Sequence, residues 1–406
     1  MRYSSDDVYR YVREKKIRSV RLAFCDVYGW EKSISITPEE VLDAFQYGVT
    51  INTRDVKNFG ENVYTDLVLH PIADTMSELP FQAEDDRMVR MFCSMTLPDG
   101  TPFERRGTKS LLRHAMDIAE VEGYEFYFGT ELEYYLMKTD EHGLPLDIPH
   151  DKATFLDIPP DDRCDSIRRN ITRSLEKMEV KPSNMFHQRG HGQNEIDFSF
   201  SNPITAGDNI TTAKTLIKVI ADRNNLYADF SPKTYENHPG NSCHITFSVQ
   251  SSDGKTDSLN HAVAGILEKI ADMTLFFNPY EESYRRFGKY GAPEYISWSS
   301  ENRSQLLRIP QTVGHFHKAE LRSPDAAMNP YLAFALIIHA ALYGIKNRLT
   351  LPDEAKFDFD TADAQTVAKY QKLPQTLEEA RELAKNSEFV NKVVPQEILE
   401  LYLKDD

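Results

Sequence analysis

The sequence predicts an α+β protein with two domains, and three observations support this fold class. The chain has 406 residues, whereas a single hydrophobic core stops growing at about 250–300 residues. The stretch LPDGTPFERRGT (97–108) contains two prolines and two glycines, a composition typical of linkers. Beyond it, apolar stretches of strand length alternate with longer helical patterns. We therefore expect one domain over residues 1–100 and a second over residues 101–406.

The amino-terminal segment predicts a small mixed unit that starts with a helix. Ser4 or Ser5 can cap a helix over residues 6–16, because a serine hydroxyl accepts a hydrogen bond from the first turn. Two stretches with strand-like composition, IRSVRLAFCDVYG and EKSISI, follow around a turn at Tyr28-Gly29. These elements imply a small mixed unit of helix and strands at the start of the first domain.

The second domain is expected to begin with a helix over residues 110–123 and to combine strands with longer helices. The predicted strands are 124–137, 194–200, 243–249, 306–311 and 318–323, and the predicted helices are 211–224 and 259–277. The apolar run AFALIIHAALYGI is too short to span a bilayer, so it predicts a buried helix. Several of the strands carry Glu, His or Arg where a half-buried strand usually carries Thr or Val.

Composition limits the class of function. A net charge of −16 argues against a surface for nucleic acid or anionic membrane. The first residues lack the apolar core of a secretory signal, so we expect a cytoplasmic protein with no membrane partner. The four cysteines, at positions 25, 93, 164 and 243, form no CxxC pair, so we expect small core residues rather than a zinc site.

The charged residues of the predicted strands form a pattern of their own. Glu131 and Glu133, in GTELEYYL, are two residues apart, so a strand would place both on one face, where a cation between them would relieve their repulsion. The other members are Glu195, His244, Glu320, Arg286, Arg303, Arg308 and Arg322. Carboxylates with one histidine suit magnesium or manganese better than zinc, and arginines suit phosphate and carboxylate oxygens. A solvated edge strand and a set of structural ion pairs remain alternatives at this point.

Five stretches of the sequence resemble the glutamine synthetase family in order and spacing. They are GTELEYYL, GHGQNEIDF, GNSCHITFS, NRSQLLRIP and KAELRSPDAAMNPYLAFA. LAFCDVYG looks like the family's amino-terminal β-grasp strand, and LPQTLEEARELAKNSEFV (373–390) like its carboxy-terminal helix. The resemblance covers nearly the whole chain. It implies a β-grasp domain followed by a catalytic domain with a curved antiparallel sheet.

The resemblance also implies roles for individual residues in a funnel that admits ATP at one end and glutamate at the other. Glu131, His244 and Glu320 would hold one Mg²⁺ or Mn²⁺, and Glu133 and Glu195 a second ion. Arg303 and Arg308 match the arginines that grip the transferring phosphate, Arg286 and Arg322 those that bind glutamate or the acyl phosphate, Gly240 a glycine beside glutamate, and Ser248 a nucleotide-contacting serine. The family commonly assembles into hexameric rings, often doubled into a dodecamer, so we expect a homo-oligomer.

Two departures from the family pattern concern the second ion and the acceptor. Where the family has a glutamate before GQNE, this chain offers Gln188 or His187, so the second ion is expected to bind more weakly, unless neither side chain is a ligand. Asn52 and Gly291 stand where two acceptor-side carboxylates are usual, and Thr246 where many members have a second histidine. Asp55 and Glu294 are candidates to replace the missing carboxylates.

The functional prediction follows from these parts. We expect an ATP-dependent ligase that activates the γ-carboxylate of glutamate as an acyl phosphate and couples it to ammonia or a small amine. The loss of two anions that attract and deprotonate ammonium favours a carbon-bearing amine. A ligase for another acid, and a non-catalytic homologue with a binding or regulatory role, remain alternatives.

Overall fold

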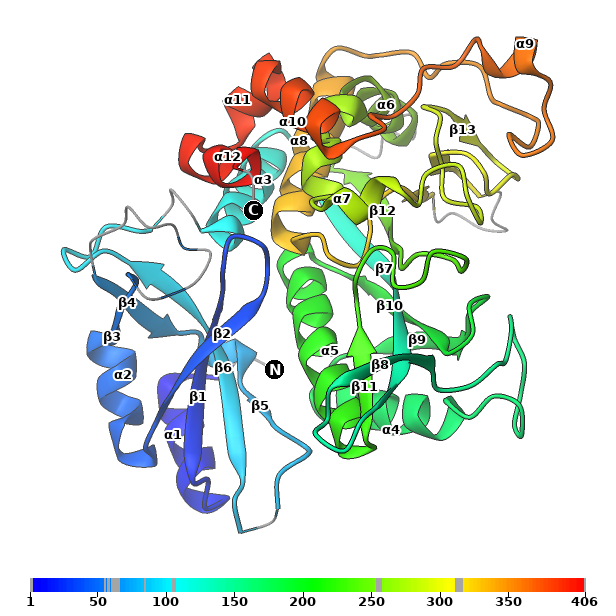
Figure 1. The fold of residues 1–406 in the computed structure, drawn as a ribbon. Helices are drawn as coiled ribbons and strands as arrows, with labels where there is room; N and C mark the ends of the chain where they lie inside the picture. Colours follow the sequence, from blue (N-terminus) through cyan, green and yellow to red (C-terminus); the bar gives the residue numbers. More distant parts are fainter. Residues whose placement is uncertain are drawn as a thin grey trace.

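The described residues of the computed structural model are 3–404 apart from 55, 57–58, 60–65, 84, 104–106, 253–257 and 311–316. They form a six-stranded sheet near the amino terminus and a nine-stranded sheet beyond it. Figure 1 shows the two sheets side by side, with the carboxy-terminal helices (red) packed together at one end of the molecule. The predicted α+β class is confirmed.

The smaller sheet carries its helices on one side. Its strands are β1 (Ser19–Cys25), β2 (Glu31–Ile36), β3 (Val49–Asn52), β4 (Asp66–Pro71), β5 (Ser77–Glu78) and β6 (Met88–Thr96), in the order β2-β1-β6-β4-β3 with β5 on β6. The helices are α1 (Ser5–Glu14) and α2 (Val41–Tyr47). As predicted, Ser4 caps α1, and its hydroxyl accepts a hydrogen bond from the Asp7 backbone at 3.1 Å.

The larger sheet is mostly antiparallel and is organised around one long strand. Its strands are β7 (Tyr124–Thr139), β8 (Pro145–Pro149), β9 (Pro182–His187), β10 (Gln193–Ser201), β11 (Leu226–Asp229), β12 (Cys243–Ser251), β13 (Trp298–Ser299), β14 (Leu307–Arg308) and β15 (Ala319–Leu321). The order is β13-β14-β15-β12-β7-β10-β9, and β8 and β11 also pair with β7. Strand β7 therefore pairs with neighbouring strands along both of its edges.

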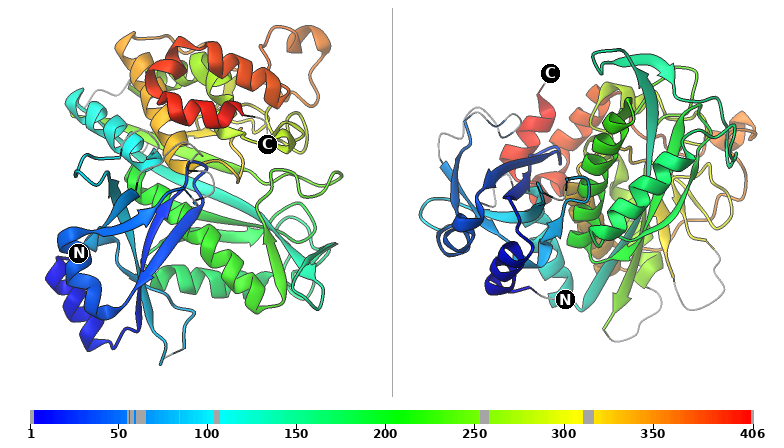
Figure 2. Two further views of the ribbon diagram at one scale, coloured as in Figure 1. Left: turned by 60° about the vertical axis from the view of Figure 1, so that its left-hand side comes forward. Right: turned by 90° about the horizontal axis from the view of Figure 1, so that it is seen from below.

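One face of the larger sheet is covered by helices that form the main core. They are α3 (Thr108–Val121), α4 (Asp165–Lys177), α5 (Pro203–Arg223), α6 (Ser258–Phe277) and α8 (Pro330–Lys346). The other helices are α7 (Glu281–Tyr284), α9 (Ala364–Val367), α10 (Leu377–Asn386), α11 (Glu388–Val393) and α12 (Gln396–Leu403). Phe128 of β7 stacks on Phe334 of α8, with ring centroids 4.4 Å apart. Helix α5 lies between the two sheets in both Figure 1 and Figure 2, and Arg90 of β6 donates to Thr212 of α5 at 2.7 Å.

The two faces of β7 differ because strand side chains alternate. Phe126, Phe128, Leu132 and Tyr134, at even positions, are buried in the core beneath the helices. Glu131 and Glu133, at odd positions, therefore lie on the opposite face. The two carboxylates therefore point away from the core that the helices cover.

Most predicted elements are present, but some bounds differ. Only Leu307–Arg308 of the predicted strand 306–311 pairs in the sheet, and position 311 lies outside the described residues. The expected carboxy-terminal helix over 373–390 is two helices, α10 and α11, because the chain turns at Ser387, whose hydroxyl caps α11. The strands that were not predicted are β3, β4, β5 and β6 of the smaller sheet and β8, β9, β11 and β13 of the larger one. Among the described residues, no helix combines the length and apolarity that crossing a membrane requires.

Candidate active site

Three of the predicted metal ligands lie together on the open face of the large sheet. Glu131 of β7 is directly opposite His244 of β12, and the His244 Nδ1 atom is 3.0 Å from the Glu131 Oε2 atom. Glu320 of β15 approaches from the next strand, with its Oε1 atom 3.8 Å from the same nitrogen. The three ligand atoms all lie within 4.8 Å of one another. Two carboxylates and an imidazole at this spacing fit a divalent cation such as Mg²⁺ or Mn²⁺.

A second group of carboxylates lies on the neighbouring strand pair, β7 and β10. Glu133 of β7 is directly opposite Glu195 of β10. The side chain of Gln188, just after β9, lies between them, and its Nε2 atom donates to Glu133 Oε1 at 2.7 Å and to Glu195 Oε2 at 2.5 Å. The other Glu133 oxygen accepts from the Ser242 backbone at 2.6 Å. His187 is fully buried and does not line the site, so Gln188 takes the position that the sequence left open between the two.

The two groups differ in how their negative charge is balanced. Burial raises the pKa of the Glu195 carboxyl well above its ordinary value, and the charges of Glu133 and Glu131 raise it further. Burial and Glu131 likewise raise the pKa of Asp197, opposite Glu131 on β10, to about 6. Sequence reasoning missed Asp197, although it lies two residues after Glu195 and therefore shares its strand face.

Glu320, by contrast, is well supplied with positive charge. Burial alone would raise its pKa, but Arg322, His244 and Arg308 outweigh burial and lower it. The Arg322 guanidinium is ion-paired with Glu320, and the Arg308 Nη1 atom is 3.4 Å from its Oε2 atom. Arg322 Nε also donates to the backbone carbonyl of Arg303 at 3.0 Å, which links the motif NRSQLLRIP to β15.

The fourth predicted arginine, Arg286, is held in a fixed orientation by hydrogen bonds. Arg286 is 1% exposed, and its guanidinium donates to the Ser323 carbonyl at 3.1 Å and to the Ser242 hydroxyl at 2.9 Å. Gly240 passes directly over it, because a Cβ atom at Gly240 would lie 2.5 Å from Arg286 Cγ and 2.3 Å from the Pro232 carbonyl oxygen. Only glycine allows this close approach.

These residues share a cavity of about 260 Å³. Of the predicted site residues, Glu131, Glu133, Gln188, Glu195, Gly240, His244, Arg286, Arg303 and Arg322 line it. Glu320 does not line the cavity but contacts His244 and Arg322, which do, and Arg308, also outside the cavity lining, contacts Glu320. Ser248 also lies outside it, further along β12, with a buried hydroxyl that has no hydrogen-bond partner among the described residues.

Other residues of the cavity were not singled out from the sequence. Among them are the aromatic side chains Phe155, Phe186 and Tyr290, the carboxylates Asp358 and Asp360, and the cations Arg189 and Lys289. The two phenylalanine rings meet edge to face with centroids 5.8 Å apart. The DFD alternation at 358–360 is the only sequence signal for the aspartates, and an isolated pair of this kind is too common to identify a site.

The residues considered for the acceptor side lie in different parts of the structure. Gly291 lines the cavity, and a Cβ atom there would have only the Arg189 Nη1 atom within 4 Å, at 3.8 Å. Asn52 is at the end of β3 in the smaller sheet and does not line this cavity. Glu294 points elsewhere, since its Oε1 atom accepts from Lys372 at 2.5 Å. Asp55 lies outside the described residues.

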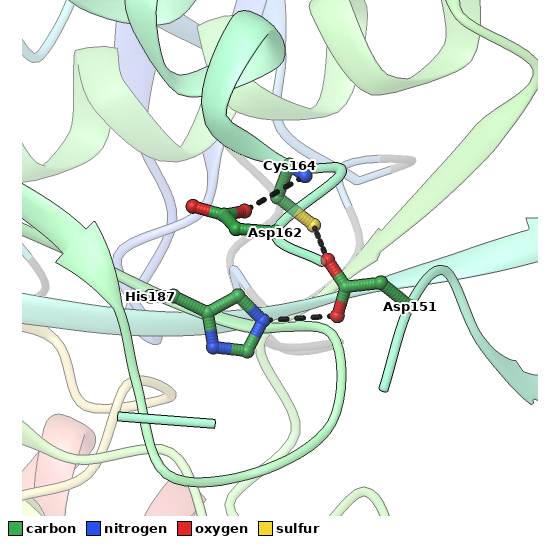
Figure 3. Close-up of side chains that lie close together, drawn as sticks. All are labelled: Asp151, Asp162, Cys164 and His187. Atoms are coloured by element: carbon green, nitrogen blue, oxygen red, sulfur yellow. Dashed lines mark hydrogen bonds and ion pairs between the residues drawn. The ribbon is translucent and has the colours of Figure 1, made fainter. Parts of the chain in front are cut away.

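A second buried cluster behind the site has metal-ligand residue types but is already satisfied by hydrogen bonds. Figure 3 shows Asp151, Asp162, Cys164 and His187 in contact. Asp151 accepts from His187 Nε2 at 2.9 Å and from the Cys164 thiol at 3.2 Å, while Asp162 is ion-paired with Arg168. Burial and the charge of Asp151 raise the pKa of the Cys164 thiol, whereas a metal needs the thiolate. We therefore interpret this cluster as a structural network.

Comparison with known proteins identifies the family. The model of "Glutamine synthetase, catalytic domain" matches residues 105–405, and that of "Glutamine synthetase, beta-Grasp domain" matches residues 16–98. The glutamine synthetase of Clostridium saccharobutylicum is 32% identical over 99% of this chain and 94% of its own length. The chain belongs to the glutamine synthetase family. The glutamine synthetase of Staphylococcus aureus (strain MW2) is 31% identical over 99% of this chain and 93% of its own.

Solved structures agree with the family fold. A GmaS/ADP complex superposes with a TM-score of 0.87 at 21% identity, covering 98% of this chain and 94% of that one. Ligand-free GmaS gives a TM-score of 0.85, also at 21% identity. The predicted β-grasp domain and catalytic domain are thereby confirmed. Family membership makes the protein an ATP-dependent ligase that joins glutamate to ammonia or an amine and that uses a divalent metal.

Proposed function

We propose that this ligase transfers the γ-glutamyl group to a carbon-bearing amine in preference to ammonia. The observation that carries the proposal is Gly291, which leaves an open cavity wall where the family usually has a carboxylate. Without a carboxylate at this position, the pocket has one anion fewer to hold a small cation such as NH4⁺ and to accept its proton. The space instead suits the alkyl part of a larger amine.

The residues around Gly291 support this acceptor class. Phe155 and Phe186 provide apolar surface to the cavity, and burying an acceptor's methylene groups there would be favourable. Asp358 and Asp360 provide carboxylates that attract a protonated amine. Burial and the neighbouring Asp358 raise the pKa of Asp360, which favours Asp360 as a proton acceptor.

For the binding and activation of glutamate, we propose the residue roles that match the family motifs. Glu131, His244 and Glu320 would hold one Mg²⁺ or Mn²⁺, which neutralises phosphate charge when bound. Arg303 and Arg308 would orient the transferring phosphate, with Ser248 towards the nucleotide. Arg322 and Arg286, beside Gly240, would bind glutamate and the acyl phosphate. The γ-carboxylate oxygen then attacks the γ-phosphorus as the bond to ADP breaks, and the amine nitrogen displaces phosphate from the acyl carbon.

The assembly belongs to the same proposal. We propose a ring of six copies, or twelve in two rings, in which the smaller sheet of one copy completes the site of its neighbour. The position of Asn52, outside the cavity of its own chain, is consistent with such sharing. Glu131, His244 and Glu320 form a group that can hold a cation beside the cavity, so we advance no non-catalytic role.

Release of ADP in the presence of ATP, Mg²⁺ and glutamate tests the proposal. Separate reactions receive ammonia, methylamine, ethanolamine or a polyamine as acceptor. We expect at least one amine to give a kcat/KM well above that for ammonia, since a positioned base usually contributes about 10² to 10⁴ in rate. Ammonia as the best acceptor of the panel would contradict the proposal.

A further inference from the structure

We propose that the amide of Gln188 occupies the place of the second cation, so that this chain holds one divalent ion tightly and a second only weakly. The proposal rests on the metal site proposed above at Glu131, His244 and Glu320. It concerns the other group, in which Glu133 and Glu195 face each other across β7 and β10.

The orientation of the Gln188 amide is set by three hydrogen bonds. Its Oε1 atom accepts from the Arg189 backbone N–H at 3.0 Å. Its Nε2 atom is therefore turned towards the carboxylates, to which it donates at 2.7 Å (Glu133) and 2.5 Å (Glu195). A cation binds amide oxygen and not amide nitrogen. Gln188 in this orientation is a partner of the carboxylates and not a third ligand.

Turning the amide over would not create a satisfactory ligand. Rotation would bring Nε2 against the Arg189 N–H, so that two donors would face each other. It would also remove the donor on which Glu133 and Glu195 now depend, and both carboxylates are buried. An ion at this position must therefore replace three hydrogen bonds, and it gains a neutral oxygen where a glutamate would supply a charged one.

The backbone that carries Gln188 is fixed from behind by the network in Figure 3. The Nδ1 atom of His187 is 2.7 Å from the Gln188 carbonyl oxygen, and its Nε2 atom is 2.9 Å from Asp151. Both partners are acceptors, so the imidazole donates through both nitrogens. Asp151 in turn accepts from the Gly192 backbone at 3.0 Å, which closes the turn between β9 and β10. The turn therefore holds the Gln188 backbone in one position.

Counting manganese ions on the ATP-free full chain tests the inference. Mn²⁺ alone is titrated by calorimetry, and free Mn²⁺ is followed by electron paramagnetic resonance. We expect one tight ion per wild-type chain and a second, much weaker one. In Gln188→Glu, the second ion should bind at least about tenfold more tightly, because the variant adds a charged oxygen ligand.

Gln188→Ala separates the two possible roles of the amide. If the amide competes with the ion, its removal tightens the weak site; if the amide is a ligand, its removal loosens that site further. Gln250→Glu, at an exposed position of β12, adds the same charge away from the site and should change neither ion.

The outcomes distinguish the inference from the proposed function. Two tight ions on the wild type, or a weak site loosened by Gln188→Ala, would overturn the inference alone. Loss of the tight ion in Glu131→Gln is expected. A wild type that binds no Mn²⁺ would contradict the proposed metal site as well.

Discussion

At the residue scale, the site depends on one ion pair at the end of β15. Arg322 is buried, ion-paired with Glu320 and hydrogen-bonded to the Arg303 carbonyl, so its guanidinium has a fixed direction and lines the cavity. A planar guanidinium can bind a carboxylate through two parallel hydrogen bonds, whereas a lysine ammonium cannot. We expect binding of the acid substrate to depend on the planar geometry of the Arg322 guanidinium and not only on its charge.

The replacement Arg322→Lys tests this role. We expect kcat/KM for glutamate to fall about 10²-fold, the usual loss when one positioned donor is removed. Steady-state kinetics with varied glutamate measures the change, and the melting temperature checks the fold. Arg285→Lys, an exposed neighbour of Arg286 outside the cavity, is the matched control. Unchanged glutamate kinetics in Arg322→Lys would contradict the assignment.

The residue types of the site could be predicted, but their partners could not. The two-residue spacing of Glu131 and Glu133 already placed both on one strand face, and the structure confirms it. The orientation of the Gln188 amide depends on the Arg189 backbone, which no spacing reveals. Asp358 and Phe155 come from loops far apart in sequence, and only the fold brings them to one cavity.

At the element scale, the turn between β9 and β10 is held by a buried pair, Asp151 and His187. Burial alone would raise the Asp151 pKa, but hydrogen bonds from His187 and other donors lower it. Burial alone would lower the His187 pKa, but Asp151 raises it. The Asp151 contribution to stability is present above its unfolded pKa, about 3.9, and the His187 contribution below its own, about 6.5. The pair should therefore stabilise the fold most between about pH 4 and 6.5.

Asp151→Asn is expected to lower the free energy of unfolding by about 3–5 kcal/mol, the usual cost of removing one partner of a buried pair. Denaturant unfolding at several pH values measures the loss. The loss should be largest between about pH 4 and 6.5 and should shrink as the pH rises through the raised His187 pKa. Asp161→Asn, an exposed position of the same loop, should have little effect. A pH-independent loss in Asp151→Asn would argue against the ion pair.

Element prediction succeeded where the chain has strong local signals. The serine cap of α1 and the apolar run of α8 are examples, and both helices are present. The strand predicted over 306–311 pairs at only two residues because its neighbours β13 and β15 have only two and three residues. Tertiary pairing, and not the local apolar pattern, sets its length.

At the scale of the whole molecule, one sheet brings the site together. Strand β7 contributes two carboxylates, and β10, β12 and β15 bring Glu195, His244 and Glu320 beside them. The order of strands in this sheet was not predictable from local patterns, and the family resemblance implied only that the sheet is curved and antiparallel. The domain division at residue 100 and the ring assembly remain predictions.

The proposed function depends on a preference for an amine over ammonia as the acceptor. A competition reaction measures this preference: ATP, Mg²⁺ and glutamate with equal concentrations of ammonia, methylamine, ethanolamine and a polyamine, with products resolved by mass spectrometry. Because the acceptors compete for one acyl phosphate, the product ratio gives the ratio of their kcat/KM values. We expect a γ-glutamyl amide of one amine to be the main product. Glutamine as the main product would show that the ligase prefers ammonia and would overturn the proposed function.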